Sequence, residues 1–206
     1  MVVAMKILGL TGDIASGKST VARLLSEAGA SHLDADLLVR ELYADAEFAA
    51  RIEARFGAVT GADGGVDRAL LAPLVLGDEA KLRDLEAIVH PAVAALRAQK
   101  IAELERNGAE AVVIEAVKLL ESGQGALCDE IWCVTARPEI QLKRMIENRG
   151  LSAEQAQERL RNQPPRADKE HLAGAVPLVW IDNSGLLCDL RQSVARQWKR
   201  FKLSGP

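Results

Sequence analysis

Residues 5–25 read MKILGLTGDIASGKSTVARLL, an apolar run followed by a glycine-rich turn and then by a helical pattern. The run Met5–Leu10 is short and continuously apolar, which is typical of a strand buried on both faces of a sheet. Beyond the turn, apolar side chains recur at the spacing of one helix face, at Val21, Leu24, Leu25 and Ala28. Gly29 supplies a stop signal for that helix. The stretch therefore predicts a strand, a loop and a helix in succession.

The turn itself, Gly12–Ser19, matches the pattern G-x-x-x-x-G-K-[ST] without substitution. Glycines let the backbone wrap around phosphate oxygens, while loop amides and the following helix N-terminus present positive partial charge. Lys18 would add a full charge at the β- and γ-phosphates, and the Ser19 hydroxyl could coordinate a bridging magnesium ion. A chance match is the alternative, but the flanking strand and helix favour a nucleotide-phosphate site. The residues expected to hold the phosphates are Gly12, Ala15, Ser16, Gly17, Lys18, Ser19 and Thr20.

Two acids, Asp34 and Asp36, directly follow a second short strand predicted at Ser31–Leu33. Ligands bind at the carboxyl edge of a parallel sheet, so both acids are expected near the phosphate site. In an extended step the two side chains point the same way, so that Asp34 can act near the metal while Asp36 accepts a hydrogen bond from an attacking hydroxyl. The alternative is structural, because Asp is a favoured N-cap and one of the two could cap a helix beginning at Leu37.

The remaining sequence alternates between strand and helix patterns. Residues 37–106 predict mostly helices, interrupted by a glycine-containing loop at 57–65. Further strands are predicted at 111–114, 130–135 and 178–181. A C-terminal helix is expected to end near Phe201, and the charged segment 138–172, broken by Pro164-Pro165, predicts a mobile flap. The alternation indicates an α/β fold in which helices cover both faces of a mainly parallel sheet.

The composition is that of a compact domain, with 206 residues of which 49% are hydrophobic and 27% charged. The formal net charge of −3 gives no overall basic footprint, so no nucleic-acid partner is expected and an anionic ligand must be held locally. No apolar run approaches the roughly 20 residues that cross a bilayer, so no membrane partner is expected. Residues 1–10 lack a basic leader region and a cleavage site, which predicts a cytoplasmic protein.

Several motifs resemble the dephospho-coenzyme A kinase family, over nearly the whole chain from Met5 to about Phe201. The segment LTGDIASGKSTVA at 10–22 is similar to the family's LTGGIGSGKSTVA, and LDADLLVREL at 33–42 is similar to its DAD-x-x-[AV]-R element. Arg68-Ala69-Leu70 and residues 85–91 resemble the family's R-x-x-L and L-x-x-[IL]-x-H-P elements. The resemblance implies that the acceptor substrate contacts Asp36, Arg40, Arg68 and His90.

The resemblance also implies a lid whose arginines close over the transferring phosphoryl group. Gln141-Leu142-Lys143-Arg144 and Arg159-Leu160-x-x-Gln163 look like the lid of that family. Arg144 would then have a catalytic and ATP-binding role, and Arg159 would face the acceptor. Taken alone, these arginines are expected on a solvated helix surface. Taken alone, His90 before Pro91 predicts the end of a helix.

Three departures from the family pattern stand out. Residues 115–121 lack the usual proline of the P-L-L-x-E element, and Lys118 and Leu119 occupy positions where acceptor contacts are expected. Arg149 stands one step later than the family's lid arginine. An acid before the last strand is missing, although Asp182-Asn183 is retained, and the resemblance places Asn183 near the adenine of ATP.

The resemblance implies a three-layer P-loop NTPase fold with a mainly parallel five-stranded sheet, a helical acceptor-binding insertion and a lid. It further implies transfer of the γ-phosphate of ATP, with Mg²⁺, to the ribose 3′-hydroxyl of dephospho-coenzyme A, giving coenzyme A and ADP. Without the resemblance, another P-loop nucleotide or small-metabolite kinase and a nucleotide-dependent switch both remain possible. A monomer or weak homo-oligomer is expected. We expect one domain at 5–202, with core segments at about 5–36, 110–136 and 174–202, a helical part at about 37–109 and the lid at about 137–173.

Overall fold

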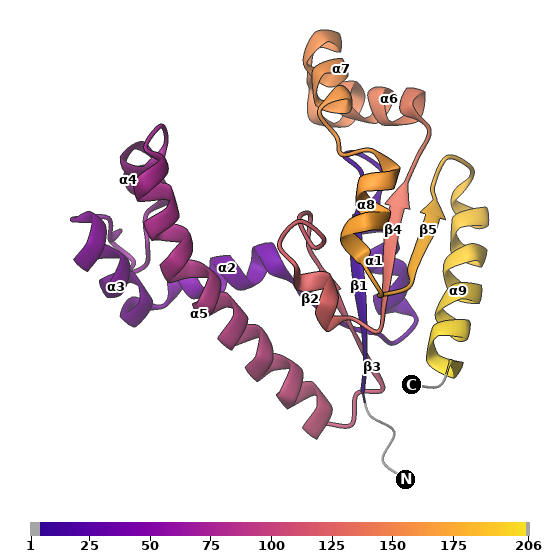
Figure 1. The fold of residues 1–206 in the computed structure, drawn as a ribbon, viewed down its shortest axis with the longest axis horizontal. Helices are drawn as coiled ribbons and strands as arrows, with labels where there is room; N and C mark the ends of the chain where they lie inside the picture. The colour runs from indigo at the N-terminus through magenta and orange to yellow at the C-terminus, as the bar shows by residue number, and fades with distance from the viewer. Residues whose placement is uncertain (1–4, 205–206) are drawn as a thin grey trace. The chain divides into compact units, whose positions relative to one another are not determined.

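The computed structural model describes residues 5–204, and Figure 1 follows the chain from end to end. Residues 1–4, on which part of the predicted cytoplasmic location depends, lie outside the described residues. The chain divides into two compact units. The first contains residues 5–32 and 104–204, the second contains residues 33–103, and each has a hydrophobic core of its own.

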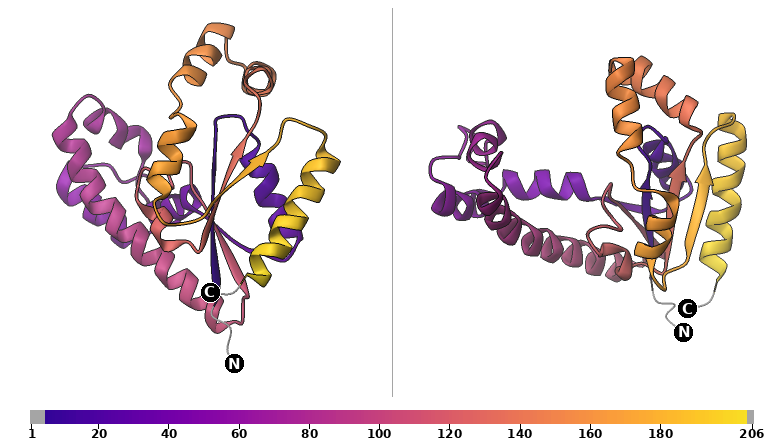
Figure 2. Two further views of the ribbon diagram at one scale, coloured as in Figure 1. Left: turned by 45° about the vertical axis from the view of Figure 1, so that its right-hand side comes forward. Right: turned by 45° about the horizontal axis from the view of Figure 1, so that its top comes forward.

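The first unit is built on a five-stranded sheet in the order β2-β3-β1-β4-β5 (Figures 1 and 2). The strands are β1 (Lys6–Gly12), β2 (Ser31–Asp34), β3 (Ala111–Glu115), β4 (Glu130–Thr135) and β5 (Leu178–Asp182). The ladders that join β3, β1, β4 and β5 are all parallel. Leu10 pairs with Glu115, so the turn after β1 and the end of β3 reach the same edge of the sheet. The predicted α/β fold with a mainly parallel five-stranded sheet is confirmed.

Helices α1 (Lys18–Glu27) and α9 (Leu187–Leu203) lie along one face of this sheet (Figure 2). Their apolar side chains share one buried cluster with the strands, and its members include Leu8, Val21, Leu24, Leu25, Trp132, Ile181, Trp198 and Phe201. The predicted apolar stripe of α1 is therefore in the core, except that Ala28 is the exposed C-cap. The other face is packed by residues 116–128, which include the 3-10 helix η1 (Gln124–Leu127).

Three helices form the segment predicted as a lid. They are α6 (Pro138–Arg149), α7 (Ala153–Arg161) and α8 (Arg166–Ala173). The break predicted at Pro164-Pro165 is confirmed, because it separates α7 from α8. Ser152 begins α7 with a capping box, in which the Gln155 amide donates to the Ser152 hydroxyl at 3.2 Å and the Ser152 amide donates to the Gln155 side chain at 3.1 Å.

The second unit is helical, as predicted. Its helices are α2 (Ala35–Ala44), α3 (Ala46–Phe56), α4 (Arg68–Val75) and α5 (Glu79–Arg106). The glycine-containing loop between α3 and α4 is closed by an antiparallel bridge between Thr60 and Val66. Apolar side chains from all four helices form the core of the unit, at Leu38, Phe48, Ile52, Val59, Leu71, Val75, Leu85, Val89 and Val93.

The helix end predicted at His90 is wrong. Helix α5 continues through Pro91 to Arg106. A proline inside a helix removes one backbone hydrogen bond and costs about 3 kcal/mol. Val89 and Val93 are buried on either side of Pro91, and burial of a side chain of this size contributes about 1.5–3 kcal/mol each. Packing of the helix face thus outweighs the local signal.

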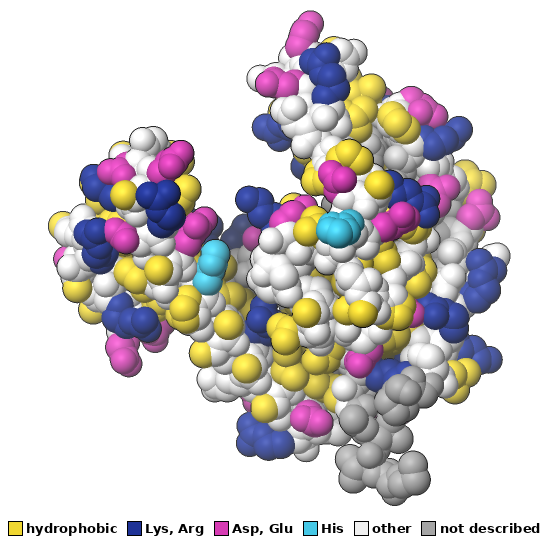
Figure 3. Space-filling model, viewed as in Figure 1, with side chains coloured by type: hydrophobic (Ala, Val, Ile, Leu, Met, Phe, Trp, Pro, Cys, Tyr) yellow, Lys and Arg dark blue, Asp and Glu magenta, His cyan; other side chains and the backbone are white. Residues whose placement is uncertain are grey.

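The surface offers no single-sign face in the view of Figure 3, where acidic and basic side chains are interspersed. Within residues 5–204, no helix has both the length and the apolar character needed to cross a bilayer. The charge that binds an anion must therefore be sought in local side-chain arrangements.

Candidate functional site

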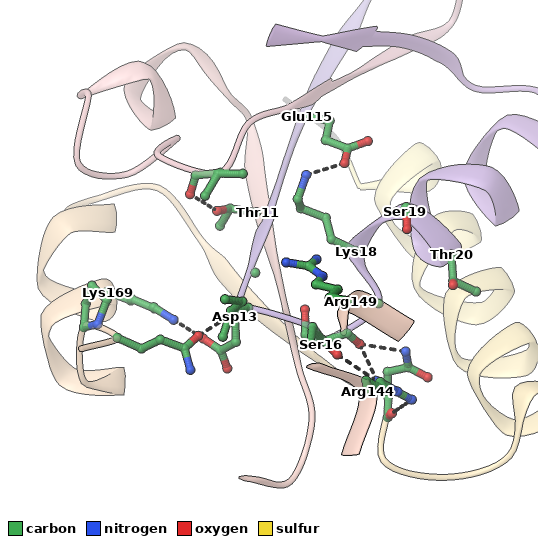
Figure 4. Close-up of a pocket in the computed structure, with 18 of the residues that line it drawn as sticks. Thr11, Asp13, Ser16, Lys18, Ser19, Thr20, Glu115, Arg144, Arg149 and Lys169 are labelled. Atoms are coloured by element: carbon green, nitrogen blue, oxygen red, sulfur yellow. Dashed lines mark hydrogen bonds and ion pairs between the residues drawn. The ribbon is translucent and has the colours of Figure 1, made fainter. Parts of the chain in front are cut away.

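A cavity of about 870 Å³ surrounds the glycine-rich turn in the first unit. Figure 4 shows that its walls come from the turn, the start of α1, the end of β3 and the helices α6 and α8. All of the predicted ATP-binding residues line it, namely Gly12, Ala15, Ser16, Gly17, Lys18, Ser19, Thr20, Arg144 and Asn183. The structure thus brings together residues that lie far apart in the sequence.

The turn requires its second glycine at Gly17. This residue has φ of 92°, in the left-handed region that a side chain disfavours. A Cβ atom there would lie 2.2 Å from the Asn183 Nδ2 atom, so Asn183 would also have to move. Helix α1 then begins at Lys18 without a side-chain cap, which leaves its first amides available to an anion.

Arg144 and Asn183 hold the carbonyl groups of the turn. The Arg144 guanidinium donates to the carbonyl oxygens of Ser16 at 3.0 Å, Ala15 at 3.3 Å and Asn183 at 2.9 Å. The Asn183 side chain donates to the Ser16 carbonyl at 2.7 Å. Because these bonds fix the carbonyl groups, the two residues shape the loop that faces the cavity. In this structure Arg144 therefore acts on the loop itself.

Glu115 is a functional candidate that the sequence analysis missed. It ends β3 and is 6% exposed, and its carboxylate lies between the Lys18 ammonium and the His32 imidazole. One oxygen pairs with the Lys18 ammonium, and the other lies 2.8 Å from the His32 Nε2 atom. Burial would raise the pKa of Glu115, but the hydrogen bonds and charges of His32 and Lys18 together lower it below the ordinary 4.5. Lys18 is thus held at the cavity by an ionised carboxylate.

Asp13 and Lys169 form a second ion pair that was not predicted. Lys169 from α8 contacts one carboxylate oxygen of Asp13, and Figure 4 shows the two side chains pointing toward each other. The Thr135 hydroxyl donates to the other oxygen at 2.7 Å. The backbone amide of Ile14 donates to the Gln163 side chain at 2.6 Å. The turn is thereby joined to both β4 and the segment before α8.

The predicted acceptor-side residues of the first unit are not gathered at the cavity. Lys118 and Arg159 are exposed and are not among its lining residues, whereas Arg149 is. Leu119 is fully buried, and its side chain packs over Gly9, whose added Cβ would lie 2.7 Å from the Leu119 Cδ2 atom. The expectation that Leu119 offers a binding surface is corrected, because its side chain belongs to the core.

The acid pair lies at the start of α2 in the second unit. Asp34 is the N-cap, and one of its carboxylate oxygens accepts from the amides of Asp36 at 2.7 Å and Leu37 at 3.3 Å. Because the helix begins at Ala35, the predicted extended step between the two acids is wrong and the capping alternative holds for Asp34. Asp36 is exposed in the first turn, one turn before the exposed Arg40.

The other acceptor-side candidates of this unit are also at its surface. Arg68 begins α4 and lies over the Tyr43 ring, with 5.0 Å between the guanidinium carbon and the ring centroid. Arg68 thus makes a cation–π interaction with Tyr43. His90 is exposed on α5. All four residues, Asp36, Arg40, Arg68 and His90, are therefore accessible to a ligand.

Comparison with known proteins identifies the family. The model described as dephospho-CoA kinase matches residues 6–189. A dephospho-CoA kinase of Geobacter sulfurreducens is 40% identical over 200 residues, which cover 96% of this chain and 100% of the relative. A solved structure from Thermus thermophilus is 34% identical, with a TM-score of 0.75 and coverage of 98% of this chain and 100% of that one. The dephospho-CoA kinase of Campylobacter jejuni shares the fold, with a TM-score of 0.67, 22% identity and coverage of 96% and 97%. The family predicted from the motifs is confirmed: this chain belongs to the dephospho-CoA kinase family.

Proposed function

We propose that this chain transfers the γ-phosphate of ATP to the ribose 3′-hydroxyl of dephospho-coenzyme A, giving coenzyme A and ADP in the last step of coenzyme A biosynthesis. The family match over residues 6–189, together with one cavity around the intact phosphate loop, carries this proposal. Another P-loop small-metabolite kinase is not favoured, because relatives that match nearly the whole chain are named dephospho-CoA kinases.

On the donor side, the loop amides and Lys18 hold the β- and γ-phosphates. Lys18 is paired with Glu115 in the structure, so arrival of the triphosphate offers its ammonium a second anionic partner. Arg144 and Asn183 hold the Ser16 carbonyl of the loop in place by hydrogen bonds. Arg144 and Arg149 would also add positive charge as the phosphoryl group moves, because both line the cavity.

Magnesium fits the donor set of this cavity. Among residues 5–204 no group of three or more His, Cys, Asp or Glu side chains could hold an ion unaided. Mg²⁺ usually takes one or two protein oxygens and completes its shell with phosphates and water. The Ser19 hydroxyl lines the cavity and would supply such an oxygen, whereas both carboxylate oxygens of Glu115 are engaged by Lys18 and His32. The bound ion would neutralise charge on the phosphates. Asp34, the other residue expected near the metal, has one carboxylate oxygen engaged in capping α2.

On the acceptor side, Asp36 is proposed to accept the hydrogen bond of the attacking 3′-hydroxyl and so orient it. Arg40, Arg68 and His90 would hold the phosphate groups and ribose of dephospho-coenzyme A, because cationic and imidazole groups suit such anionic ligands. Lys118 and Arg159 are exposed cations that would reach the acceptor only after a change of conformation. We accordingly keep the helical part at about 37–109 as the acceptor-binding part and 137–173 as the lid.

The test is ADP release with MgATP and dephospho-coenzyme A, compared with acceptor-free and other-acceptor mixtures. Asp36→Asn keeps the shape of the side chain but removes its charge, so kcat should fall about 100-fold or more while the KM for ATP changes less than about threefold. Asp84→Asn removes another acid of the same unit, whose side chain is 41% exposed and paired with Arg55, and should leave both constants unchanged. Equal rates in wild type and Asp36→Asn would refute the role of Asp36, and release only with another acceptor would refute the reaction.

A cytoplasmic location and a monomeric or weakly self-associating state are part of the proposal. Cell fractionation would test the first statement, and analytical ultracentrifugation would test the second.

A further inference from the structure

The phosphate loop of this chain contains a negative charge. Asp13 is the second residue of the loop Gly12–Ser19 and lines the cavity proposed for ATP. Its side chain is only 15% exposed, so water screens its charge weakly. An uncompensated carboxylate at this place would repel the triphosphate. The loop can therefore take an anion only if the charge of Asp13 is neutralised by other groups.

Both carboxylate oxygens of Asp13 are engaged. Lys169 contacts Oδ1, and the Thr135 hydroxyl donates to Oδ2 at 2.7 Å. The Lys169 side chain is 10% exposed, so the pair as a whole is largely removed from water. Removal of one partner from a buried ion pair leaves the other partner uncompensated, which is far more costly than the loss of both. The presence of the Lys169 charge should therefore decide whether Asp13 repels an anion in the loop.

The same contacts attach the segment 163–169 to the loop. The Ile14 amide donates to Gln163, one residue along from the Asp13 pair. A second cavity, of about 290 Å³, is also lined by Asp13, Gln163 and Lys169. The contact between the loop and the segment 163–169 therefore borders both cavities.

We propose that Lys169 is a positioning residue for the phosphoryl donor, acting through Asp13. The ion pair neutralises the negative charge that the loop itself carries, and it holds the segment 163–169 against the loop while ATP binds. Lys169 thus serves Asp13 and is not itself required as a ligand of the phosphates. The inference rests on the proposed function, because it concerns how that cavity accepts ATP.

A double-mutant cycle on MgATP affinity distinguishes this indirect role of Lys169 from direct contact between Lys169 and the phosphates. Lys169→Met leaves the Asp13 carboxylate uncompensated, so the dissociation constant of MgATP should rise about tenfold or more. Asp13→Asn removes the charge but keeps a hydrogen-bonding side chain, and its affinity should stay within about threefold of wild type. The double variant Asp13→Asn/Lys169→Met should bind MgATP more tightly than Lys169→Met alone. A double variant as weak as Lys169→Met would overturn the proposal in favour of direct phosphate contact.

Two further variants control for stability and for general effects on α8. Lys169→Arg keeps the charge and should bind MgATP within about threefold of wild type, whatever the folding of the Met variant. Glu170→Gln breaks the exposed Arg166–Glu170 pair on the same helix. It should change neither the affinity for MgATP nor the amide hydrogen exchange of residues 163–173. Amide hydrogen exchange of residues 163–173 should be faster in Asp13→Asn than in wild type and Glu170→Gln. Unchanged exchange in Asp13→Asn would overturn the attachment.

Isothermal calorimetry with MgATP and no acceptor keeps this inference separate from the proposed reaction. Wild-type protein that binds MgATP but does not phosphorylate dephospho-coenzyme A would refute the reaction, and the cycle would still decide the role of Asp13. Wild-type protein that binds no MgATP would refute both statements.

Discussion

Glu115 ends a strand that is otherwise apolar, and it connects the chemistry of the loop to the stability of the sheet. Its carboxylate is buried between Lys18 and His32, and these two partners lower its pKa. A carboxyl group that loses its proton more easily in the folded state than in the unfolded state stabilises folding when it is ionised. Ligand binding and acid stability are thus linked at one side chain.

Glu115→Gln should make the protein less stable by about 1–3 kcal/mol near neutral pH, because Lys18 and His32 lose a charged acceptor. The contribution of Glu115 is present above its ordinary pKa of 4.5 and is lost as the pH falls through the lower folded pKa. The difference between wild type and variant should therefore shrink on acidification. Urea unfolding of both proteins over a pH series measures it, and a difference independent of pH would contradict the ionised pairing.

The residues of the phosphate loop could be predicted from the sequence because they are consecutive and the loop needs each at a fixed spacing. The partners of that loop could not. Lys18 and Glu115 are 97 positions apart, and Asp13 and Lys169 are 156 positions apart, so only the fold brings them together. Asp34 and Asp36 are only two positions apart, yet their relation depended on where a helix begins. Helix α2 begins two residues before the predicted Leu37, which places Asp36 inside it.

At the scale of elements, strands were predicted more precisely than helix ends. The strand predicted at 130–135 forms with the same bounds, because short apolar runs between turn residues leave little freedom. Helix α5 shows the opposite case, since burial on both sides of Pro91 carries the helix through a residue that normally ends one. Local signals thus fail where packing over several turns competes with them.

Helix α7 depends on its capping box at Ser152. Ser152→Ala removes the hydroxyl that accepts from the Gln155 amide, which should destabilise the start of α7 by about 1 kcal/mol. Hydrogen exchange of amides in the first turn of α7 should accelerate about fivefold, because RT is about 0.6 kcal/mol. Gln157→Ala changes an exposed residue in the middle of the same helix and should leave exchange of that first turn unaltered. An equal effect of both variants would show that the cap contributes nothing.

At the scale of the molecule, the two hydrophobic cores should respond separately to damage. Ile52 is fully buried in the core of residues 33–103, and Ile52→Ala should cost about 2–5 kcal/mol there. We expect faster hydrogen exchange within 33–103 and little change in β1 and β4. Ile131→Ala, at a fully buried position of the sheet, is the matched variant and should give the reverse pattern. The same exchange pattern in both variants would indicate one cooperative unit.

The position of β1 in the sheet has a consequence for synthesis on the ribosome. This central strand emerges first, but it pairs with β3 and β4, and its Lys6 lies opposite Ala111. Residues 33–103 form a contiguous unit with its own core, and this unit can fold before β3 and β4 have been synthesised to pair with β1. At translation speeds of about 5–20 residues per second, the wait is on the order of ten seconds. For that time the nascent chain exposes an unpaired apolar strand, and unpaired strand edges of this kind favour aggregation until β3 and β4 arrive.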